Sequence, residues 1–104
     1  MVATPFDPWT ALEDARRHVA GGSAVVQVKL AAGLVAYPTG RSAMVWYGAG
    51  DAREVLDGMG RYTGDGYRVR LRFGEDSAQE AKALLRRFRD RFGAWPRDNV
   101  EPAS

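Results

Sequence analysis

The spacing of apolar residues changes between two neighbouring segments, and this change constrains the fold more than any other feature. In Tyr67–Phe73, apolar and arginine residues alternate without interruption, which is the period of a half-buried strand. In Ser77–Phe92, apolar residues recur at intervals of three and four, which is the period of an amphipathic helix. A strand followed directly by a helix with one apolar face predicts an α+β fold.

Weaker patterns predict the remaining elements, in the overall order α-β-β-β-α-β-α. Asp7 and Pro8 suit the start of a first helix, which Gly21 ends. The capping-box spacing of Asp51 and Glu54 predicts a short helix after the third strand. The first three strands are expected at 24–30, 34–37 and 43–47, as an antiparallel meander. We therefore expect an antiparallel sheet of about four strands with helices packed on one face.

Length and composition indicate one domain inside the cell. A chain of 104 residues fills one hydrophobic core, and an apolar share of 45% is typical of folded proteins. We expect a single α+β domain at 1–93 and a loosely ordered C-terminal tail at 94–104, in which Trp95 alone docks. The chain has no cysteine and no apolar run of membrane-spanning length, so we expect a cytoplasmic protein without membrane contact.

Residue types that commonly carry catalysis or hold metals are scarce. His18 is the only histidine, and the absence of cysteine removes thiolate ligands and Cys–His nucleophiles. The turn at Gly48 and Gly50 differs from a dinucleotide-binding loop, because Arg53 occupies the third glycine position. We therefore predict that the protein is not an enzyme and holds no cofactor and no metal.

Arginine dominates the cations and is concentrated on the alternating strand. All fifteen cations except Lys29 and Lys82 are arginine. Arg68, Arg70 and Arg72 are predicted to project from one face of the strand, about 6–7 Å apart. Such a row can contact successive phosphates of a nucleic acid. It equally fits charges that protect an edge strand from aggregation, so both interpretations stay open.

The last helix carries a second group of cations. Lys82, Arg86 and Arg89 line one flank of the helix, and Arg87 and Arg91 join them. These side chains either extend a binding surface or form an ordinary solvated helix face.

Two adjacent aromatic residues, Trp46 and Tyr47, point to opposite faces of the third strand. If helices cover one face, one of the two must leave the core. An exposed aromatic side chain beside Arg70 and Lys29 is typical of platforms that bind single-stranded nucleic acid. Tryptophan and tyrosine also anchor protein interfaces, and composition does not separate these two roles.

These features together predict a binding module without enzymatic activity. In the first hypothesis, its arginine-rich surface engages an acidic partner, most simply the backbone of a nucleic acid. In the alternative, an exposed sheet face or edge binds another protein, as in an adaptor, an inhibitor, a chaperone-like domain or a homodimer. The residues that we assign to the binding surface are Arg68, Arg70, Arg72, Lys82, Arg86, Arg89 and Trp46.

Overall fold

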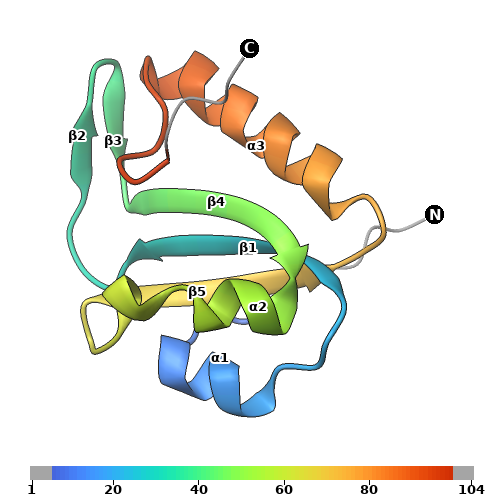
Figure 1. Ribbon diagram of the computed structural model, residues 1–104. Helices are drawn as coiled ribbons and strands as arrows, with labels where there is room; N and C mark the ends of the chain where they lie inside the picture. Colours follow the sequence, from blue (N-terminus) through green and yellow to red (C-terminus); the bar gives the residue numbers. More distant parts are fainter. Residues whose placement is uncertain (1–5, 100–104) are drawn as a thin grey trace.

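The central strand of the protein is β1 (Ser23–Leu30), which pairs with a strand on each side. In the computed structural model, which describes residues 6–99, β4 (Met44–Asp51) and β5 (Tyr67–Phe73) run antiparallel to β1 in the order β4-β1-β5 (Figure 1). Five consecutive residues of β1, 24–28, are buried, so both faces of the strand are covered. The predicted α+β class and antiparallel sheet are confirmed.

A separate hairpin replaces the middle of the predicted meander. β2 (Val35–Tyr37) pairs with β3 (Gly40–Ser42), and Pro38 and Thr39 form the tight turn between them. The strand predicted at 43–47 was expected to pair with the strand before it, but β3 takes that place. The longer strand β4, which contains residues 44–47, pairs with β1 instead. The main sheet has three strands, with the hairpin outside it.

Helices lie on both faces of the sheet, whereas the sequence predicted them on one face. α1 (Leu12–His18), α2 (Ala52–Asp57) and the 3₁₀-helix η1 (Gly60–Tyr62) lie on one side, and α3 (Ser77–Phe92) lies on the other (Figure 1). The main core lies between the sheet and the first group, and Phe88 of α3 is buried against the opposite face. Because both faces of β1 are buried, each face needs its own cover.

The first helix is shorter than predicted because the chain before it pairs with β5. The backbone N–H groups of Asp7 and Thr10 donate to carbonyls of β5 at 2.9 Å each, and Thr10 accepts a further bond from Val69 at 2.8 Å. Asp7 does not cap a helix, because its backbone N–H bonds to β5 and α1 begins only at Leu12. The N-terminal segment, residues 6–10, covers the outer edge of β5.

The chain after α3 covers the other edge of the sheet. The Asp98 N–H donates to the backbone of β4 at 3.0 Å, and the side-chain amide of Asn99 bonds the N–H and the carbonyl of Tyr47 at 3.0 and 2.8 Å. Within the segment predicted as a loosely ordered tail, Asp98 and Asn99 are thus bonded to β4, and Pro96 is fully buried. The rest of that tail, 100–104, lies outside the described residues.

Two helix boundaries agree with the sequence. The Asp51 carboxylate accepts a hydrogen bond from the backbone N–H of Glu54 at 3.2 Å and so caps α2. Gly93 ends α3 with a φ of 79°, a conformation that favours glycine. Within residues 6–99, none of the helices is long and apolar enough to cross a bilayer.

Candidate functional site

The arginine row of β5, Arg68, Arg70 and Arg72, lies on the α3 side of the sheet. In the strand register, these side chains neighbour Gln27 and Lys29 of β1. α3 packs mainly over β4 and β1, so the row lies beside the helix rather than beneath it (Figure 1). All three arginines are half-buried.

Two aromatic side chains of the N-terminal segment pack against these cations. The ring centroid of Phe6 lies 4.3 Å from Cζ of Arg72 and 4.4 Å from Cζ of Arg70. The ring of Trp9 lies 4.4 Å from Cζ of Arg70 and 4.5 Å from Nζ of Lys29. Cations this close to an aromatic ring are attracted to it. We call these five residues the cation–aromatic ladder.

Arg70 is the centre of the ladder. Its Nε donates a hydrogen bond to Oε1 of Gln27 at 2.7 Å, and Gln27 is only 3% exposed. Burial lowers the pKa of Arg70 from its ordinary value, and the neighbouring Tyr47 acts in the opposite direction. Within residues 6–99, no hydrogen bond involves the terminal nitrogens of Arg70 or the ammonium of Lys29.

The other two arginines of the row are held by contacts within the protein. Arg72 forms an ion pair with Glu80 of α3. Arg68 donates hydrogen bonds to the backbone carbonyls of Asp65 and Tyr67 at 3.2 and 2.7 Å. Both interpretations of the row assumed arginines in open solvent. Here Arg72 links β5 to α3, and Arg68 bonds carbonyls close to it in the chain. The N-terminal segment already covers the outer edge of β5.

The cations of α3 lie on two different flanks of the helix. The contact of Glu80 with Arg72 identifies the flank that faces β5. Arg87 and Arg91 follow Glu80 by about two and three helical turns and therefore share this flank. Lys82, Arg86 and Arg89 follow one another at helical spacing on the opposite side, and Cζ of Arg89 lies 5.0 Å from the ring of Trp95 near β4. All five cations are exposed.

Trp46 lies on the opposite face of the sheet from the ladder. It packs half-buried against the main core, and its ring covers Gly48 so closely that a Cβ there would lie 2.0 Å from the ring. Tyr47 is also covered, because its ring lies 6.0 Å from that of Phe88. The seven assigned binding residues therefore occupy three places: the ladder side of β5, the far flank of α3, and the α1–α2 face.

Sequence reasoning missed Trp9 because its interval of three to Leu12 fits the predicted helix, and it missed Phe6 because that residue lies before the predicted helix start at Asp7. Pro8 did not decide between the two structures, because an extended residue before proline is compatible both with a helix cap at Asp7 and with strand pairing. Nothing in the local sequence shows which strand such an extended segment pairs with.

Within residues 6–99, no group of three or more histidine, aspartate or glutamate side chains is arranged to hold a metal ion. Comparison with protein-family models, with curated proteins and with solved structures found no match.

Proposed function

We propose that this protein is a non-enzymatic binding module whose cation–aromatic ladder engages an acidic partner, the phosphate backbone of a nucleic acid. The observation that supports this proposal is that aromatic rings already hold the cations of the ladder in place. Phe6 and Trp9 hold Lys29, Arg70 and Arg72 in contact with rings 4.3 to 4.5 Å away, on one side of the sheet.

Pre-ordered cations bind with a smaller entropy cost than mobile ones. A free arginine or lysine side chain loses rotamer entropy worth up to about 2 kcal/mol when it is immobilised. In the ladder, packing against the aromatic rings has already restricted the side chains. The terminal nitrogens of Arg70 and the ammonium of Lys29 can then donate to phosphate oxygens at little further cost.

The near flank of α3 adds charge to the same side. Arg87 and Arg91 are exposed, and they share their flank with the Glu80 that contacts the ladder. Lys82, Arg86 and Arg89 on the far flank contribute long-range attraction but cannot contact the same short segment of backbone. The proposed contact surface is therefore the ladder together with Arg87 and Arg91.

Binding of fluorescently labelled, mixed-sequence single- and double-stranded RNA and DNA tests this proposal, at about 50 and 200 mM salt. We expect detectable binding at the lower salt that falls steeply at the higher. The double variant Arg87→Gln/Arg91→Gln should bind more weakly, with a salt slope smaller by about one for each phosphate that the variant no longer neutralises.

The matched control is Lys82→Gln/Arg89→Gln, which removes the same charge from the far flank of the same helix. It should reduce affinity less and leave the salt slope nearly unchanged. If no probe binds at the lower salt, the proposal is wrong. Equal losses of affinity in the two double variants would show that net charge, and not the ladder side, determines binding.

The protein-interaction hypothesis depended on a free sheet face, a free edge or an exposed aromatic residue. The N-terminal segment and Asn99 cover the two edges, and Trp46 and Tyr47 are both packed. Among the described residues, the large hydrophobic side chain that is well exposed is Leu34, at 62%. A single exposed leucine does not favour this alternative.

A further inference from the structure

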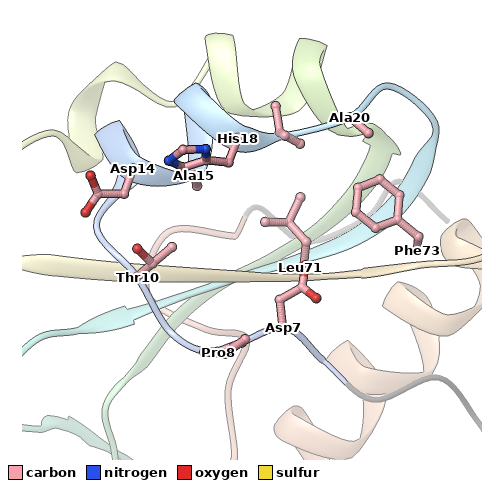
Figure 2. Close-up of a pocket in the computed structure, with 10 residues that line it drawn as sticks. Asp7, Pro8, Thr10, Asp14, Ala15, His18, Ala20, Leu71 and Phe73 are labelled. Carbon is pink, nitrogen blue, oxygen red and sulfur yellow. The ribbon is translucent and has the colours of Figure 1, made fainter.

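A pocket of about 410 Å³ lies beside the N-terminal segment, and Figure 2 shows the residues that line it. It is bounded by α1, by the residues that follow α1, and by β5. Leu71 and Phe73 of β5 and Ala15 and Val19 on the α1 side give it a largely apolar lining. This volume lies within the range of sites that hold small molecules.

Four polar residues also line the pocket: Asp7, Thr10, Asp14 and His18. The Asp14 carboxylate is paired with Arg17 at 2.6 Å. Within residues 6–99, no hydrogen bond involves the side chains of Asp7, Thr10 or His18. The pocket therefore combines an apolar lining with a few polar groups that have bonding capacity left, which is the usual make-up of a ligand site.

The charge at the pocket is negative. Asp7 and Asp14 are the acidic residues of the lining, and neither lysine nor arginine contributes to it. Arg17 offsets Asp14, which leaves Asp7 as the carboxylate that a ligand can meet. Arg53 approaches the backbone carbonyl of Val19 at 3.5 Å from the α2 side. A carboxylate beside an apolar surface attracts an ammonium group and repels a second carboxylate.

We propose that this pocket binds a small amphipathic amine. Its apolar body packs on Leu71 and Phe73, and its protonated amino group lies at Asp7 with Thr10 and His18 as neighbouring hydrogen-bond partners. This site is separate from the ladder, because the N-terminal segment turns Phe6 and Trp9 to one side and Asp7 and Thr10 to the other.

Three probes of similar shape and different charge test the proposal on the full chain at neutral pH: phenethylamine, phenethyl alcohol and hydrocinnamate. Titrations are followed by NMR through the methyl groups of Ala15, Val19 and Leu71. We expect saturable shifts at these methyls, with the amine binding about threefold more tightly than the alcohol, as a partly exposed ion pair implies. Hydrocinnamate should bind most weakly.

Two variants make the result specific. Asp7→Asn should reduce the affinity of the amine to that of the alcohol and leave the alcohol unchanged. Ala20→Trp places a large side chain at an exposed residue of the rim and should weaken both probes. The proposal is overturned if none of the three probes shifts the pocket methyls, or if the amine shows no advantage over the alcohol in the unmodified protein. Nucleic-acid binding tests the ladder independently of either outcome.

Discussion

Arg70 connects three separate parts of the chain through one side chain. It belongs to β5, donates to the buried amide of Gln27 in β1, and contacts the rings of Phe6 and Trp9 in the N-terminal segment. A guanidinium group can do this because its planar fork bonds along its edge while its face packs on an aromatic ring. Arg70 is therefore expected to stabilise the fold as well as serve the proposed site.

Replacement of Arg70 by methionine tests this structural role. Arg70→Met keeps an apolar stem but removes the donor to Gln27 and the charge on both rings. We expect the free energy of unfolding to fall by about 1–3 kcal/mol, mainly because the Gln27 amide oxygen loses its partner while buried. Urea unfolding measures the change. Arg68→Met is the matched control, since Arg68 bonds only carbonyls near its own turn, and about 0.5 kcal/mol is expected. Similar decreases in the two variants would contradict a special role for Arg70.

At the scale of elements, the two segments that flank the domain act as covers for the sheet. Residues 6–10 pair with β5, and Asp98 and Asn99 bond to β4. Unpaired strand edges are templates for pairing with other chains. These two segments therefore protect the sheet more directly than the arginine row does.

The cover over β4 depends on the side chain of Asn99. Asn99→Ala removes the partners of both backbone groups of Tyr47, so we expect a loss of about 1 kcal/mol in stability. The Tyr47 amide should exchange with solvent deuterium faster than in the unmodified protein. Asn99→Asp keeps an acceptor for the Tyr47 N–H and should protect that amide better than alanine does. Unchanged exchange in Asn99→Ala would show that this side chain is not the cover.

At the scale of the whole molecule, the carboxylate of Asp98 ties the C-terminal segment to the main core. Its side chain is 5% exposed, accepts hydrogen bonds from Arg97 at 3.0 Å and from the Tyr62 hydroxyl at 2.9 Å, and pairs with Arg61 at 3.4 Å. Burial acts to raise the pKa of Asp98, but the hydrogen bonds from Arg97 and Tyr62 and the nearby guanidinium charges outweigh it. The pKa of Asp98 is therefore lowered from its ordinary value.

The lowered pKa of Asp98 predicts a pH-dependent contribution to stability. A carboxyl group with a lower pKa in the folded state stabilises the fold above its unfolded value of about 3.9, and this stabilisation is lost as the pH falls through the folded value. Asp98→Asn should therefore be less stable than the unmodified protein at pH 7. The difference should narrow as the pH drops below about 4. Chemical unfolding at several pH values measures it, and a constant difference would contradict the network.

Features set by neighbouring residues could be predicted from the sequence. The alternation in β5, the apolar stripe of α3, the cap of Asp51 on α2 and the stop at Gly93 each depend on residues a few positions apart. In the candidate site, two cations of the ladder could be predicted, because the sequence placed Arg70 and Lys29 beside a candidate binding platform. The aromatic half could not, because Trp9 fits the spacing of the predicted helix and Phe6 lies before the start of that helix.

By itself, the sequence determined the α+β class, the antiparallel strands and the positions of the helix boundaries near Asp51 and Gly93. Only the tertiary structure decided that β4 pairs with β1, that helices cover both faces, and that α3 divides its cations between two flanks. It also decided that Phe6 meets Arg72, 66 positions later in the chain. The physical reason is separation along the sequence. Periodicity and helix capping depend on residues within a few positions of one another. Strand pairing and cation–aromatic packing depend on which distant segments the folded chain brings together.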